Sequence, residues 1–116
     1  MIDDNKELTE IICEVLGMIG YEATGATSGE EGIAKAKEQK PDVILCDIEM
    51  VGMNGYDIAE YIRKDNELKD VCLIAISGYS SREDVERSIE TGFDRHLGKP
   101  FSLDDLKMTL DEVLIK

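Results

Sequence analysis

The sequence is poor in basic residues and has no long apolar run, and each shortage excludes a class of function. Thirteen Lys and Arg residues stand against 26 Asp and Glu residues, which gives a net charge of -13. Such a chain repels phosphate backbones and anionic lipid surfaces, so we expect neither nucleic acid nor a membrane as its partner. No apolar run approaches the ~20 residues that a membrane-spanning helix needs, and no signal peptide is recognisable.

Cysteine and tryptophan are also scarce: there are three cysteines and no Trp. Cys13, Cys46 and Cys72 lie in apolar runs and lack metal-ligand spacing. We therefore expect reduced, buried thiols in a cytoplasmic protein. The 42% of hydrophobic residues is enough for the core of one domain, which we expect to extend over residues 1–116.

Two patterns of apolar residues alternate along the chain. Helical spacing predicts helices over 8–19, 28–39, 56–66, 81–91 and 102–114, and Ser28 and Glu31 are spaced as a capping box at the second of them. Short apolar runs predict strands over 43–47 and 71–76 and, less clearly, over 21–26 and 93–97. Helices that alternate with strands are typical of an α/β, doubly wound parallel sheet with helices on both faces.

Acidic and polar residues stand where the strands end. Asp47 and Ser77 end the two fully apolar strands, Lys99 follows the last strand, and Asp3 and Asp4 stand where a first strand would end. Ligands gather beyond the carboxyl ends of parallel strands. Three carboxylates in one pocket repel one another unless a cation joins them, and Mg²⁺ with a substrate phosphate fits such a pocket. A metal-held carboxylate beside a lysine is suited to attack on a phosphoryl group.

The set Asp3-Asp4, Asp47, Ser77 and Lys99-Pro100 resembles that of the receiver domain of two-component response regulators, a family typified by the chemotaxis regulator. The resemblance covers the whole chain. It implies a flavodoxin-like sheet of five strands in the order 2-1-3-4-5. It also implies a cis peptide bond between Lys99 and Pro100, an arrangement that only proline makes easily accessible.

The resemblance also implies the role of each acidic residue. Asp47 would be the phosphoacceptor, with a histidine kinase or a histidine phosphotransfer protein as the donor. Asp4 would bind Mg²⁺ directly and Asp3 would bind it through water, while Glu49 would supply its backbone carbonyl. The domain would then be a regulatory phosphoacceptor that assists its own phosphorylation and dephosphorylation, and not an enzyme with turnover.

Ser77 and Lys99 would contact the phosphoryl oxygens. Phosphorylation would draw Ser77 inward and let His96 move in, which would reshape the face formed by the fourth helix, the fifth strand and the fifth helix. His96 stands where the family usually has Tyr or Phe. Because an unperturbed histidine titrates near ~6.5, the switch could respond to pH.

Two features of this chain depart from the usual pattern of the family, and a third points to a subgroup of it. Val51 replaces the usual proline after the acceptor, so we expect a less rigid loop. Ile2 alone precedes the acid pair, so the first strand is expected to be truncated or its place to be filled by something else. Open sheet edges, or the switch face, could then support a homodimer. The string 92–97 is similar to receivers attached to hybrid sensor kinases.

Two alternative functions remain open. A degenerate receiver could act only as a protein-binding module, because the metal site depends on a short first strand. A small aspartate-nucleophile phosphatase of the haloacid dehalogenase type would also place an Asp after a strand, but it needs a second Asp where this chain has Glu49. The sequence does not distinguish a single-domain regulator from a receiver within a hybrid kinase or a longer regulator.

Overall fold

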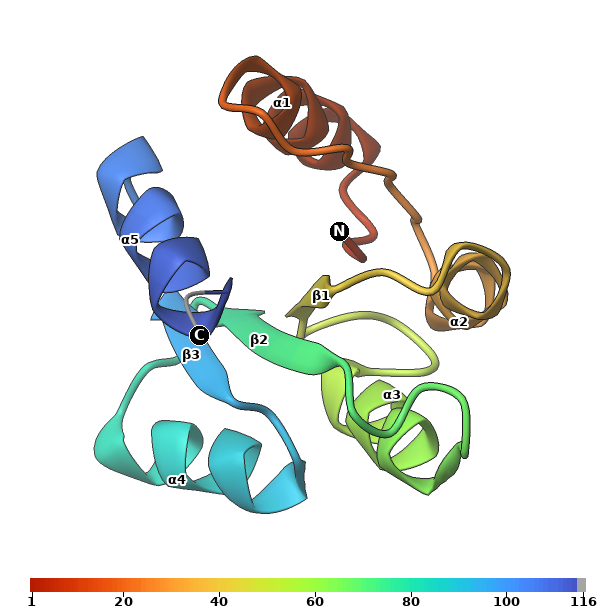
Figure 1. Ribbon diagram of the computed structural model, residues 1–116. Helices are drawn as coiled ribbons and strands as arrows, with labels where there is room; N and C mark the ends of the chain where they lie inside the picture. The colour runs from red at the N-terminus through yellow and green to blue at the C-terminus, as the bar shows by residue number, and fades with distance from the viewer. Residues whose placement is uncertain (115–116) are drawn as a thin grey trace.

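A parallel sheet lies at the centre of the molecule, between two layers of helices (Figure 1). The computed structural model describes residues 1–114, and in that range the sheet has three regular strands in the order β1-β2-β3. Asp47 lies opposite Ile76, and Ser77 lies opposite Gly98. The strands are β1 (Val43–Asp47), β2 (Cys72–Ser77) and β3 (Arg95–Gly98).

Five helices of the described range cover the two faces of this sheet. Side chains from α2 and α3 pack with Leu73 and Ala75 in one apolar cluster. Side chains from α1 and α5 pack with Ile74 and Ile76 in the other. The alternation of β2 side chains between the clusters is that of a strand buried on both faces. The helices are α1 (Lys6–Met18), α2 (Gly29–Gln39), α3 (Gly55–Lys64), α4 (Arg82–Thr91) and α5 (Leu103–Leu114).

Side-chain caps begin the helices close to the predicted residues. The predicted box at α2 is only half formed: Ser28 Oγ accepts from the Glu31 amide, but Glu31 Oε1 accepts from the amide of Thr27. Complete capping boxes are instead found at α3 (Asn54–Asp57) and α4 (Ser81–Asp84). Each cap satisfies backbone donors that the first turn of a helix leaves free.

Ile2 occupies an interior position of the sheet, between β1 and Ala26. Its amide donates to the Leu45 carbonyl at 2.7 Å, and its carbonyl accepts from the Asp47 amide at 2.8 Å. It forms single parallel bridges to Cys46 on one side and to Ala26 on the other. The order of the five positions is therefore the predicted 2-1-3-4-5, with the first two strands each reduced to one bridging residue.

The strand predicted over 21–26 is wrong except at Ala26. Ala26 exchanges backbone hydrogen bonds with Met1 and Asp3, whereas residues 21–23 border a cavity and have no strand to pair with in the described range. A cavity of about 920 Å³ lies beside this segment, between Tyr21 and Ala23 on one side and Val43 and Leu45 on the other. Within the described residues, Ile2 is thus the residue that joins Ala26 to β1.

Arg63 links α3 to the segments that surround α4 and β3. Its guanidinium donates to the carbonyls of Lys69, Val71 and Gly92, and to the Asp94 carboxylate at 2.9 Å. Gly92 has a φ of +128°, and a Cβ there would lie 2.8 Å from Arg63 Cγ. Glycine is therefore required where α4 ends.

Two other expectations are settled by the fold. Of the three cysteines only Cys46 is fully buried; Cys13 and Cys72 are partly exposed, because they lie at the margins of the core. The Lys99–Pro100 bond is cis, as predicted. No helix within residues 1–114 is long and apolar enough to cross a membrane.

We predict that Ile2→Ala lowers the free energy of unfolding by about 2–4 kcal/mol, the usual cost of emptying a buried aliphatic site. Ile2 is 3% exposed, and its side chain fills the space over Gly32. Urea denaturation measures the change. Ile11→Ala is the matched control, since Ile11 is 56% exposed and its truncation should cost much less. Equal losses for the two variants would contradict the central role of Ile2.

Candidate functional site

The polar residues predicted to converge do lie together at the carboxyl edge of the sheet. Asp47 and Ser77 are the last residues of β1 and β2, and Lys99 follows β3 directly. Asp3 and Asp4 follow the bridging residue of the first position. The parallel register brings these strand ends to one edge, so five residues distant in sequence share one site.

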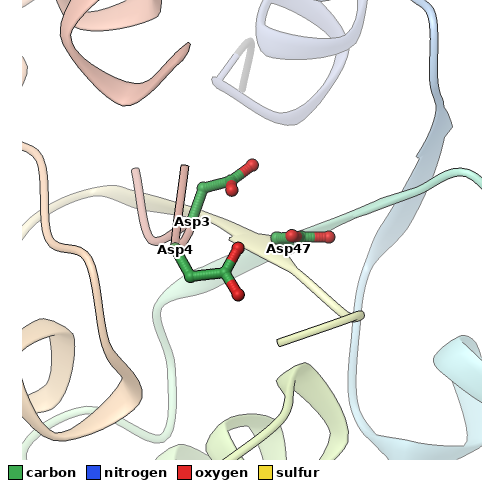
Figure 2. A group of neighbouring side chains, drawn as sticks. All are labelled: Asp3, Asp4 and Asp47. Atoms are coloured by element: carbon green, nitrogen blue, oxygen red, sulfur yellow. The ribbon is translucent and has the colours of Figure 1, made fainter. Parts of the chain in front are cut away.

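Three carboxylates form an acidic cluster at this edge. One oxygen from each of Asp3, Asp4 and Asp47 lies within 4.8 Å of the others. Figure 2 shows the side chains of Asp3 and Asp4 beside that of Asp47. Asp3 and Asp47 are 1% and 3% exposed, whereas Asp4 is open to solvent. Two carboxylates of the cluster are therefore buried, and the third is accessible from solvent.

Lys99 supplies a positive charge to the buried pair. Its ammonium lies 3.1 Å from Asp3 Oδ2 and 3.6 Å from Asp47 Oδ2. Burial lowers the pKa of Lys99, but the hydrogen bond to Asp3 and the charge of Asp47 outweigh it, so the pKa is raised overall. Lys99 is therefore a fixed ammonium at the site.

The surroundings of Asp47 disfavour its charged form. Burial and the neighbouring charge of Asp3 raise the pKa of Asp47 from 3.8 to about 6, although Lys99 and the Glu49 amide act in the opposite direction. One ammonium does not balance three carboxylates. Hard oxygen ligands with excess negative charge suit a small divalent cation, so the residues present fit Mg²⁺.

Backbone contacts hold the two buried acids in place. The Asn5 amide donates to Asp3 Oδ1 at 2.9 Å, and the Glu49 amide donates to Asp47 Oδ1 at 3.2 Å. Helix α1 is capped by the Asn5 side chain and not by the acids, since Asn5 accepts from the Leu8 amide. Capping therefore does not account for Asp3 and Asp4.

The loop after β2 engages the hydroxyl of Ser77. Ser77 Oγ donates to the Tyr79 carbonyl and accepts from the Tyr79 amide, both at 2.9 Å. The amide of Gly78, which lies between Ser77 and Tyr79, donates to Glu49 Oε1 at 2.9 Å. The receiver interpretation of the sequence gave a role to the backbone carbonyl of Glu49 and none to its carboxylate. The position of Glu49, two residues after the strand-end Asp47, was the signal in the sequence that could have pointed to this carboxylate.

His96 is held between two serines that the sequence reasoning also missed. Its Nδ1 lies 3.1 Å from Ser88 Oγ and its Nε2 lies 3.2 Å from Ser80 Oγ. Ser88 is fully buried and donates to the Val85 carbonyl. Because the Ser88 hydroxyl proton goes to Val85, the hydrogen-bond network assigns the donor role in the Ser88 contact to His96 Nδ1.

The response regulator receiver domain model matches residues 1–111, and the chain belongs to this family of two-component signalling domains. It resembles the polar-differentiation response regulator DivK of Brucella anthropi, with 27% identity over 103 residues that cover 89% of this chain and 84% of DivK. It also resembles the sensor histidine kinase CheAY of Helicobacter pylori, with 38% identity over 103 residues. That match covers 87% of this chain but 13% of the kinase.

The solved structures it resembles have the same fold. Chemotaxis protein CheY4 of Vibrio cholerae has a TM-score of 0.92 at 29% identity, covering 97% of this chain and 94% of that chain. A putative response regulator from Chloroflexus aurantiacus has a TM-score of 0.91 at 26% identity, with coverage of 99% and 94%. The predicted fold and family are confirmed. Receiver domains are regulatory phosphoacceptors that work with histidine kinases or phosphotransfer proteins and bind Mg²⁺ in an acidic pocket.

We predict that, without divalent cations, the charge of Asp47 destabilises the fold as pH rises. The folded state retains the Asp47 proton up to about pH 6, whereas an ordinary carboxyl releases it near 3.8. Stability contributed by the neutral form is therefore lost between these values and stays lost above them. Asp47→Asn should raise the free energy of unfolding at pH 7.5 by about 2 kcal/mol and change it little at pH 3.5.

Urea denaturation in a chelating buffer at both pH values gives this difference. Asp42→Asn is the control, because Asp42 is an exposed acid just before β1, at the opposite edge of the sheet. A gain for Asp47→Asn that is the same at pH 3.5 and pH 7.5 would show that the effect is not electrostatic.

Proposed function

We propose that this receiver domain accepts a phosphoryl group on Asp47 from the phosphohistidine of a histidine kinase or a histidine phosphotransfer protein. The observation that carries the proposal is a buried strand-end carboxylate with Lys99 at 3.6 Å and two further acids beside it. An Asp47 oxygen attacks phosphorus, and the P–N bond of the donor breaks. The imidazole nitrogen keeps the electron pair and takes a proton from solvent, and an acyl phosphate remains on Asp47.

The neighbouring residues position and neutralise the transferred group. Lys99 is available to a phosphoryl oxygen because its ammonium already lies between Asp3 and Asp47. Ser77 can donate to another oxygen once its hydroxyl leaves the Tyr79 carbonyl. Asp3, Asp4, Asp47 and the backbone carbonyl of Glu49 would hold Mg²⁺, which when bound neutralises charge on the phosphoryl oxygens. By this arrangement the domain assists its own phosphorylation.

We assign the output to the face formed by α4, β3 and α5, with β3 in the fifth position of the sheet. Withdrawal of Ser77 from Tyr79 changes the loop that carries Ser80, and Ser80 contacts His96 on β3. His96 in turn contacts Ser88 on α4. A change at Asp47 thus has a contiguous path to this face. Homodimerisation through this face or a sheet edge, and the lack of nucleic-acid binding, stay predictions.

The contacts of Ile2 and Glu49 speak against the two alternative functions, a degenerate receiver and an aspartate-nucleophile phosphatase. A degenerate receiver was considered because of the short first strand, yet Ile2 alone brings Asp3 and Asp4 to Asp47. In the phosphatase reading a second acid should serve as proton donor, but the Glu49 carboxylate accepts a hydrogen bond from Gly78.

We predict that acetyl phosphate with Mg²⁺ adds one phosphoryl group to the chain and that Asp47→Asn abolishes the addition. Intact mass spectrometry counts the groups added. Lys99→Met should slow the addition strongly, because the ammonium that stabilises the phosphoryl oxygens is lost. Wild-type protein that stays unmodified, or Asp47→Asn protein that is still modified, would refute the proposed acceptor.

We also predict saturable Mg²⁺ binding that Asp4→Asn weakens about tenfold, because the site loses one charged ligand. Asp4 is exposed, so its replacement should leave the fold intact. Isothermal titration calorimetry measures the dissociation constant. Asp42→Asn removes an equal charge at the opposite edge and should leave the affinity nearly unchanged. Indistinguishable affinities for the two variants would rule out Asp4 as a ligand.

A further inference from the structure

The side chain of Glu49 crosses from the loop after β1 to the loop after β2. Its amide donates to Asp47 Oδ1 at 3.2 Å, and its Oε1 accepts from the Gly78 amide at 2.9 Å. One residue therefore spans the distance from the Asp47 carboxylate to the Gly78 amide. Glu49 and Gly78 are both exposed, so this contact lies at the open side of the site.

Both hydrogen-bond donors at the end of β2 are already occupied. The hydroxyl of Ser77 donates to the Tyr79 carbonyl, and the amide of Gly78 donates to the Glu49 carboxylate. A phosphoryl group on Asp47 would bring three strong acceptor oxygens into this space. It could use these donors only after the present acceptors are displaced.

The acceptor on Gly78 differs from the one on Ser77 because it is charged. Hydrogen bonds to a carboxylate are stronger than those to a neutral carbonyl. The Glu49 charge also acts on Asp47: burial and Asp3 raise the pKa of Asp47 most, and Glu49 adds to them. The same charge would repel an incoming phosphate, so it opposes phosphorylation through both competition and repulsion.

We propose that the Glu49 carboxylate is an internal competitor for the phosphoryl group, which occupies the Gly78 amide in the unmodified protein and must leave when Asp47 is phosphorylated. The inference rests on the proposed role of Asp47 as acceptor. It makes Glu49 a positioning residue that sets the rate of phosphorylation. Its departure would also release the loop after β1 from the loop after β2.

The alternative explanation is that Glu49 only links the two loops as a structural brace. Two substitutions distinguish this brace from competition for the Gly78 amide. Glu49→Gln keeps an acceptor oxygen for Gly78 but removes the charge, and Glu49→Ala removes both. Competition predicts faster phosphorylation in both variants. A brace predicts that the Gln variant matches wild type and that the Ala variant is no faster.

The test measures initial rates of phosphorylation by acetyl phosphate at saturating Mg²⁺, with intact mass as the readout. We expect Glu49→Gln to be about threefold faster than wild type and Glu49→Ala about tenfold faster, the range that the loss of one charged hydrogen bond supports. Glu38→Gln is the matched control, because Glu38 is an exposed acid near the end of α2 that leads toward the start of β1. Thermal unfolding of each variant confirms that it is folded.

Rates for both Glu49 variants that do not exceed the rate of Glu38→Gln would overturn the inference while leaving the acceptor role of Asp47 intact. Absence of phosphorylation in the wild type would instead remove the proposed function on which it rests. The Gly78 amide resonance provides a second readout. In the wild type it should shift on phosphorylation, and in unmodified Glu49→Ala it should already have left its wild-type position. A Gly78 resonance that phosphorylation does not move would also overturn the inference.

Discussion

The repulsion among Asp3, Asp4 and Asp47 is the constraint on which the rest of the site depends. Two of these acids are buried, and the cost of keeping Asp47 charged appears as its raised pKa. Lys99 offsets part of the repulsion from the far end of the chain, 96 residues away from Asp3. The charge of the site therefore favours the binding of an added cation.

The backbone contacts of Ile2 set the position of the acid pair relative to Asp47. Hydrogen bonds to Leu45 and Asp47 fix Ile2 beside β1, and the next residue then directs its carboxylate toward Lys99. Within the described residues, the bridges of Ile2 to Cys46 and Ala26 join the segment that carries the acid pair to the rest of the sheet. A cavity of about 920 Å³ lies beside the first half of β1.

Much of the fold and the site could be predicted because the decisive signals are local. Apolar runs ending in Asp47 and Ser77 fix two strands and one edge of the sheet, and parallel pairing then brings Lys99 to the same edge. Side-chain partners across loops could not be predicted, because they depend on rotamers and on distances between segments far apart in sequence. The Glu49–Gly78 contact, which spans 29 residues, and the serines on either side of His96 belong to this second group.

The Arg63 contacts give helix α4 two unlike ends. Near Gly92, where the helix ends, a buried part of a guanidinium bonds to carbonyls and to Asp94. Ser80, in the loop before the helix, and Ser88, within it, contact His96 through neutral hydroxyl groups, which form weaker bonds than charged groups do. The end of α4 at Gly92 is therefore held by charged contacts, whereas the loop between Ser77 and the helix is joined to β3 through one neutral hydroxyl group.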